Sequence, residues 1–189
     1  MFENRKTKLA PPFTGPGVDK EMYYEEKEFY YALGRAISQW ADVEERLYLL
    51  YQKIIHSDNF FGMSASYFSM INFSNKLDMV DKVLRASYFD ETILNKWGKI
   101  SERIRTKNIH RNHIAHYSTT FNISKKTGDK IYLSPSVSNI NAALAKKTLS
   151  KKHTYNTRRL EELVPVFAKL ANDIHNFVLV LPYTNETKT

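Results

Sequence analysis

The stretch that decides the fold covers residues 91–117 and reads ETILNKWGKISERIRTKNIHRNHIAHY. Its apolar residues recur every three or four positions, at Ile93, Trp97, Ile100 and Ile104. This spacing is typical of one face of an α-helix that packs against a core. Arg111 continues the same face seven residues after the last of them. Because a buried charge without a partner is strongly destabilising, the pattern predicts that Arg111 meets an acid or a ligand phosphate.

The same periodicity predicts two helices before this one. The first covers about residues 21–56 and ends at the polar cluster Ser57-Asp58-Asn59. Its apolar stripe consists of Phe29, Leu33, Ile37, Trp40, Leu47, Tyr51 and Ile54. The second helix covers about residues 73–88. The aromatic residues 60–69 between them give no clear prediction.

A last helix is predicted to run to Leu181, before Pro182, with Thr157 as its N-terminal cap. Pro165 lies inside this pattern. Since proline removes a backbone hydrogen bond from a helix interior, we expect the helix to start later or to kink there.

The period changes after Tyr117. Residues 119–123 and 130–133 have the pattern of short strands, and Thr127-Gly128-Asp129 between them is a turn signal. A small β-hairpin is therefore predicted, followed by an irregular basic stretch.

The predicted fold class is all-α: a four-to-five-helix bundle with a small β-hairpin and basic insert, at about residues 118–156, before the last helix. Residues 21–182 would form a single helical domain between a flexible arm at residues 1–20 and a tail at 183–189.

The excess charge lies in one segment. The chain has a net charge of +8, and between residues 124 and 160 it has nine basic residues and one acid, Asp129. Such a segment attracts polyanions, usually RNA or DNA, although it also fits a solubilising insert. The candidate RNA-binding residues are Lys146, Lys147, Lys151, Lys152, Arg158 and Arg159.

Three polar residues near the end of the 91–117 helix are suited to chemistry on phosphates. Asn112 and His116 are four residues apart, so they share a face beside that of Arg111. Histidine moves protons near neutral pH, and arginine stabilises the charge of a phosphorane. An asparagine beside them can position a hydroxyl or fix the imidazole. These groups suffice for metal-independent RNA cleavage, in which a 2′-hydroxyl attacks the adjacent phosphate.

A carboxylate on the first helix is predicted to face Arg111. Helical phase places Glu44 on the inward side, between Trp40 and Leu47. We predict that Glu44 pairs with Arg111 or orients it. The alternative is a salt bridge that holds two helices in register and has no part in catalysis.

The motif Arg111-Asn112-x-x-x-His116 resembles the Arg-x4-His motif of HEPN domains, and the flanking Ala115, Tyr117 and Trp97 are also similar. The resemblance covers about residues 25–120 and the last helix, and it is closest to the abortive-infection branch that acts in phage defence.

The resemblance implies a homodimer in which two motifs meet, with a toxin-like or defence RNase activity. Arg111 and His116 would be the catalytic pair, with Asn112 beside them and Tyr117 in support. It also allows an antitoxin or regulatory partner, although Ser118 stands where toxins of this family that have a nucleotidyltransferase antitoxin often carry tyrosine.

Other histidine, carboxylate and aromatic patterns have simpler interpretations. His110, His113 and His116 are spaced by three, but no carboxylate lies near them, so we expect no metal site and no cofactor. His110 and His113 are expected to face solvent or RNA. Lys76, Asp78 and Asp81 are expected on a solvated face of the 73–88 helix. Among the aromatic residues, Tyr117 and Tyr155 are the candidates for stacking on bases.

Several protein classes are excluded or disfavoured. The chain has no cysteine, which excludes disulfides and thiolate chemistry. It has no phosphate-binding glycine loop, no nucleophile elbow and no His-Glu-x-x-His motif, which disfavours nucleotide hydrolases, serine hydrolases and zinc proteases. No secretory signal or 18-residue apolar run is evident, so we expect a cytoplasmic protein without a membrane partner.

The sequence thus predicts a metal-independent endoribonuclease of HEPN type that acts as a dimer. The alternative is a non-catalytic HEPN-like module that binds RNA, a nucleotide or a protein partner.

Overall fold

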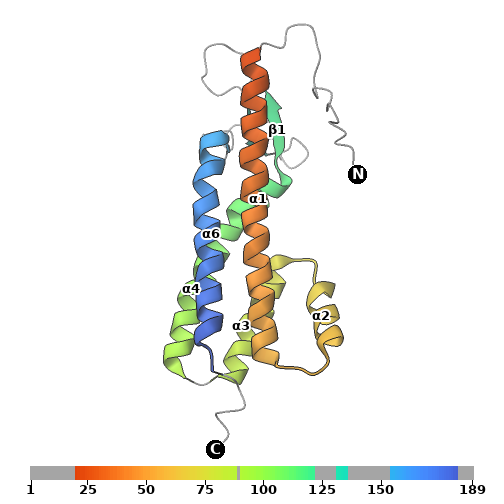
Figure 1. Cartoon of the computed structure of the whole chain (residues 1–189), viewed down its shortest axis with the longest axis vertical. Helices are drawn as coiled ribbons and strands as arrows, with labels where there is room; N and C mark the ends of the chain where they lie inside the picture. The colour runs from red at the N-terminus through yellow and green to blue at the C-terminus, as the bar shows by residue number, and fades with distance from the viewer. Residues whose placement is uncertain (1–19, 89, 122–130, 136–153, 183–189) are drawn as a thin grey trace, which may run out of the picture.

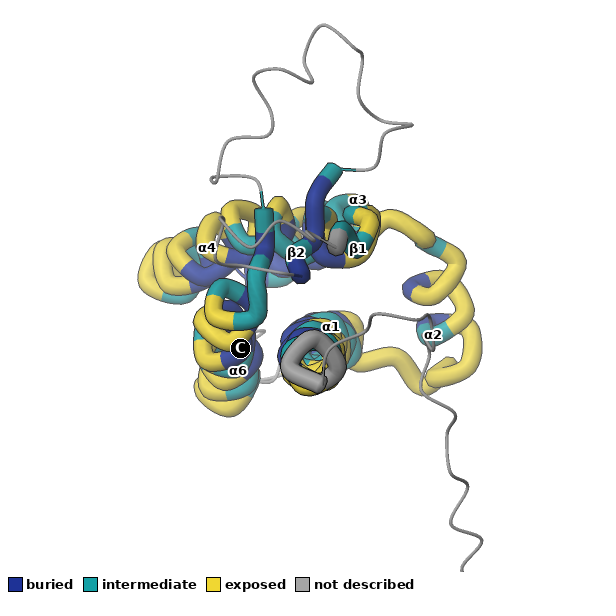
Figure 2. The backbone as a smooth tube through the Cα atoms, turned by 90° about the horizontal axis from the view of Figure 1, so that it is seen from above, coloured by how far each residue is buried: buried dark blue, intermediate teal, exposed yellow. Residues whose placement is uncertain are grey.

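Two long helices form the spine of the protein. The computed structural model describes residues 20–88, 90–121, 131–135 and 154–182. Helices α1 (Lys20–Ile55) and α6 (Thr157–Val180) lie side by side and run in the same direction (Figure 1). Viewed from above, α1 is central, with α6, α2 and the α3–α4 pair arranged around it (Figure 2). The described residues thus form the predicted helical bundle.

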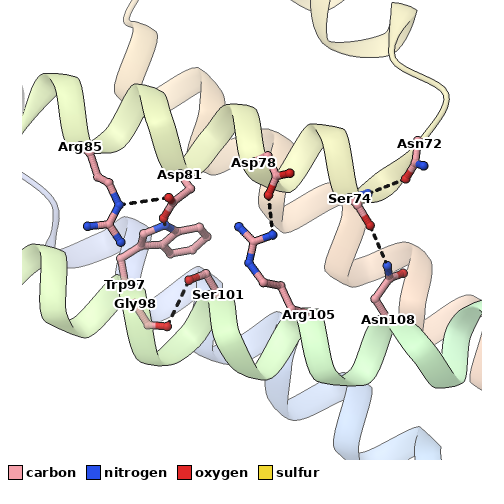
Figure 3. Close-up of polar contacts among 10 residues, drawn as sticks. All are labelled: Asn72, Ser74, Asp78, Asp81, Arg85, Trp97, Gly98, Ser101, Arg105 and Asn108. Carbon is pink, nitrogen blue, oxygen red and sulfur yellow. Dashed lines mark hydrogen bonds and ion pairs between the residues drawn. The ribbon is translucent and has the colours of Figure 1, made fainter.

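Helices α3 (Phe73–Ser87) and α4 (Glu91–His116) form an antiparallel pair. Polar contacts join them along their length (Figure 3). The buried indole Nε1 of Trp97 donates to Asp81 Oδ1 at 2.9 Å, and Arg105 forms an ion pair with Asp78. The expectation that Asp78 and Asp81 belong to a purely solvated face is therefore wrong, because both hold α3 to α4.

The core is centred on Trp40 of α1. Its ring makes edge-to-face contacts with Phe73 of α3 and Phe167 of α6, each with ring centroids 5.0 Å apart. All three side chains are buried. One residue of the predicted α1 stripe is outside this core: Ile37 is 48% exposed, and it lines a surface groove described below.

The segment that gave no clear prediction is a helix, α2 (Phe60–Ser69). The side chain of Asn59 caps it by accepting a hydrogen bond from the backbone N–H of Gly62 at 2.9 Å. The Ser57-Asp58-Asn59 cluster therefore ends α1 and also starts α2. Only Met63 and Tyr67 of α2 are buried, four residues apart on its inner side.

The β-hairpin has the predicted position with small shifts in its bounds. Strands β1 (Ser118–Phe121) and β2 (Ile131–Ser134) pair antiparallel, with Ser118 opposite Ser134. Ile131 and Leu133 of β2 are buried in the core. The predicted turn at 127–129, residues 1–19 of the arm predicted at 1–20, and the tail at 183–189 lie outside the described residues, and Lys20 belongs to α1.

Helix α6 differs from its prediction at two points. Asn156, rather than Thr157, is the cap, and its side chain accepts from the N–H of Arg159 at 3.0 Å. The helix does not start late at Pro165 but continues through it. Pro165 and Glu161 are both exposed, so the Glu161 carbonyl that lacks an i+4 partner is on the solvent side, where water can satisfy it.

In the described part of the chain, α6 is also the one helix long and apolar enough to cross a membrane by length and composition. Eight of its residues are buried, and the helix packs along α1. A core helix passes the same test, so this finding is weak evidence for a membrane span.

Candidate functional site

The predicted pair between Arg111 and Glu44 forms. Arg111 Nη2 donates to Glu44 Oε1 at 3.2 Å, and Trp40 Nε1 donates to the same oxygen at 2.9 Å. The two charged side chains keep 32% and 30% of their surface exposed. The pair therefore lies at the edge of the core, where a ligand can reach the guanidinium, rather than inside it.

Asn112 and His116 are exposed at the end of α4. Asn112 Oδ1 accepts a hydrogen bond from Arg111 Nη1 at 3.2 Å, so Asn112 and Glu44 together fix the guanidinium. Arg111 and His116 are five residues apart, which places them about 140° apart around the helix axis. One copy of α4 therefore presents them on different sides of the helix.

A groove of about 420 Å³ opens beside Arg111. Residues of α1, α2, α3 and α4 line it. Buried Trp40 and Tyr67 and exposed Ile37 and Phe68 contribute apolar surface, while Lys76 and Arg111 supply positive charge. Glu44 and Glu45 supply negative charge at the same groove.

The hydroxyl of Tyr67 is unusual because it is buried and has no hydrogen-bond partner among the described residues. The residue is 1% exposed. Burial raises the pKa of Tyr67, and the charges of Glu44 and Tyr48 raise it further. A buried hydroxyl without a partner costs roughly 1–3 kcal/mol, so this groove carries an unmet hydrogen-bonding group.

A second polar cluster includes His110 and His113, which flank Arg111 in the sequence but lie on another side of α4. The hydroxyl of Tyr155 contacts Nδ1 of His110 at 2.8 Å and Nδ1 of His113 at 2.9 Å. Tyr155 is fully buried, and its backbone pairs with that of Leu133 in β2. The expectations that both histidines face solvent or RNA, and that Tyr155 stacks on bases, are therefore wrong: the three residues fasten α4 to the hairpin.

The cluster imposes a protonation pattern. A phenol hydroxyl has one hydrogen, so when both histidines are neutral it donates to one Nδ1 and accepts from the other. The two rings must then be different tautomers. Burial lowers the pKa of His110, with further lowering from Lys107, Arg159 and His113. Burial raises the pKa of Tyr155 to about 12, so its hydroxyl keeps its proton at neutral pH.

Tyr117, predicted to support the site, stacks on His113 with ring centroids 4.6 Å apart and an interplanar angle of 18°. Burial raises the pKa of Tyr117. The ring continues the Tyr155 cluster rather than joining the Arg111 side of the helix.

The candidate RNA-binding residues divide into three groups. Lys146, Lys147, Lys151 and Lys152 lie outside the described residues. Arg158 is exposed and pairs with Glu162 at 3.1 Å. Arg159 has a structural role, since its guanidinium lies 4.4 Å from the Tyr155 ring centroid and donates to the Thr154 carbonyl at 2.6 Å.

Within the described ranges, no group of three histidine or acidic side chains is arranged to hold a metal ion. Comparisons with protein-family models, with curated proteins and with solved structures gave no match.

Sequence reasoning missed two parts of this region. The groove depends on α2, whose helical form was not predicted. The histidine cluster depends on Tyr155, which is 45 residues from His110 in sequence. A signal for the cluster was present, because His110 and His113 are three apart and share a face of α4.

Proposed function

We propose that this protein is a metal-independent endoribonuclease of HEPN type, in which Arg111, Asn112 and His116 act on an RNA phosphate. The observation that carries the proposal is the guanidinium of Arg111, oriented by Glu44 and Asn112 yet one-third exposed. Two fixed anchors preorganise an arginine for a phosphate, and its exposed part is free to bind one.

The chemistry needs one proton acceptor and one proton donor besides this cation. The 2′-oxygen loses its proton and forms a bond to phosphorus, and the bond from phosphorus to the 5′-oxygen breaks. In a dimer, His116 of one copy takes the proton from the 2′-oxygen, and His116 of the second copy delivers one to the leaving 5′-oxygen. The products are a 2′,3′-cyclic phosphate and a 5′-hydroxyl. Arg111 stabilises the charge on the non-bridging oxygens.

The angle between the two residues favours a site made by two copies. Because Arg111 and His116 project about 140° apart on one helix, a single phosphate meets both more easily between two α4 helices than on one. The proposed active form is therefore a homodimer with the ends of both α4 helices at one cleft.

Variants of single histidines test the proposal. His116→Ala should abolish cleavage of RNA by the purified protein and leave its thermal midpoint unchanged, since His116 is exposed. His175→Ala, a partly buried histidine on α6, is the matched control and should cleave normally. Equal cleavage by wild type and His116→Ala would remove His116 from the mechanism.

A second candidate is a HEPN-like module that binds RNA or a partner without cleaving. The observation in its favour is that Glu44 already neutralises Arg111 across α1 and α4, as a structural ion pair would. RNA binding that weakens steeply with salt, with no cleavage in any condition, would favour this function.

A further inference from the structure

We propose that the groove beside Arg111 is a nucleoside subsite, which takes the base and ribose attached to the phosphate that Arg111 holds. The inference rests on the proposed function and names the part of the substrate that the groove recognises. Arg111 itself lines the groove, so a phosphate on its guanidinium leaves the attached nucleoside at the groove.

The size and lining of the groove fit a nucleoside. Its volume of about 420 Å³ lies in the usual range for small-molecule sites. Phe68 keeps 60% of its surface exposed, so part of its ring is accessible to a base. The Lys76 ammonium lies over this ring at 5.5 Å from its centroid, and the Tyr48 ring lies 4.9 Å from it.

The charges of the groove select more than a simple anion. Arg111 and Lys76 are accompanied by Glu44 and Glu45, so an inorganic phosphate gains less from this groove than a phosphate that also carries a base. Glu45 is exposed and can accept a hydrogen bond from an exocyclic amino group of a base. A nucleoside monophosphate combines the ring, the hydrogen-bond donor and the acidic group.

The Tyr67 hydroxyl is an independent indication of a ligand. The residue lines the groove, is 99% buried and has an unmet hydroxyl within the described structure. Phe68 packs against the Tyr67 ring, with centroids 5.3 Å apart, and keeps 60% of its surface exposed. A polar edge of a bound base that reaches the Tyr67 hydroxyl would satisfy it.

The test uses 5′-AMP, ribose 5-phosphate and inorganic phosphate as probes, with binding followed by the two tryptophan indole N–H resonances. Trp40 lines the groove, and Trp97 is buried between α3, α4 and α6, so it serves as an internal control. We expect 5′-AMP to shift the Trp40 resonance and not that of Trp97. We expect it to bind about 5- to 150-fold more tightly than ribose 5-phosphate, the range that stacking of one base gives.

The matched variants are Phe68→Ala and Phe61→Ala. Both residues are exposed phenylalanines of α2, but Phe61 does not line the groove. Phe68→Ala should reduce the affinity for 5′-AMP to that for ribose 5-phosphate, and Phe61→Ala should leave it unchanged. Tyr67→Phe should weaken binding of 5′-AMP without lowering the thermal midpoint.

Three results would overturn the subsite: equal affinity for all three probes, no shift of Trp40 at millimolar 5′-AMP, or a Phe68→Ala variant that loses self-association instead of nucleotide affinity. The last would show that a second copy covers the groove. The two proposals fail in different ways. Binding of 5′-AMP without RNA cleavage would refute the ribonuclease and support the subsite. RNA cleavage that Phe68→Ala does not change would support the ribonuclease and refute the subsite.

Discussion

Replacement of Tyr155 by phenylalanine tests whether the hydrogen bonds of Tyr155 to His110 and His113 hold α4 to the hairpin. The change keeps the buried ring and removes the hydroxyl that contacts His110 at 2.8 Å and His113 at 2.9 Å. A hydrogen bond contributes roughly 0.5–1.5 kcal/mol net, so losing two should cost about 1–3 kcal/mol. In a chain of this size 1 kcal/mol lowers the thermal midpoint by roughly 2–4 °C, so a loss of about 2 kcal/mol corresponds to about 4–8 °C.

The matched control is Tyr67→Phe, a second buried tyrosine whose hydroxyl has no partner in the described structure. Its removal should leave the free energy of unfolding unchanged or increase it. Urea titrations of wild type and both variants measure the difference. Equal destabilisation by the two changes, or a change below about 0.5 kcal/mol for Tyr155→Phe, would refute the stabilising role of the Tyr155 hydroxyl.

Three further predictions concern the same helices. The pKa of His110 is lower in the folded chain than in the unfolded chain, so below about pH 6.5 the unfolded chain binds more protons than the folded one. The free energy of unfolding should therefore be highest above about pH 6.5 and decrease as the pH falls. In urea titrations, His110→Asn should reduce this pH dependence. Glu44→Gln should change the free energy of unfolding by about 1 kcal/mol or less, because the ion pair with Arg111 is one-third exposed. The same variant should reduce RNA cleavage more than tenfold. A variant that is destabilised but cleaves RNA normally would show that Glu44 has a structural role. In urea titrations, Asp81→Ala should cost about 1–3 kcal/mol because it leaves the buried indole N–H of Trp97 unpaired. Asp78→Ala breaks a half-exposed pair with Arg105 and should cost about 1 kcal/mol or less.

Helical phase alone was enough to predict the pair at the candidate site. Apolar spacing in the 91–117 segment sets the direction of Arg111, and spacing in α1 sets that of Glu44, so their contact follows once the two helices pack. The partial exposure of the pair did not follow, because it depends on how far the end of α4 diverges from α1.

The sequence did not predict α2 or the contacts of Tyr155, because the first has no clear apolar face and the second joins residues that are distant in sequence. Helix α2 exposes Phe60, Phe61 and Phe68, so its apolar residues do not mark an inner face. Tyr155 reaches His110 and His113 because its backbone pairs with Leu133 of β2, and no local sequence pattern predicts this pairing. Pro165 is tolerated because it faces solvent, a property that the packing of α6 decides.

The ends of the products test metal-independent cleavage of RNA most directly. Purified wild-type protein is incubated in EDTA with a short RNA and with the same RNA carrying 2′-deoxyribose at the cleaved position. The account predicts that the RNA is cut to 2′,3′-cyclic phosphate and 5′-hydroxyl ends and that the 2′-deoxy substrate is left intact. Cleavage of the 2′-deoxy substrate, or activity that EDTA abolishes, would contradict it.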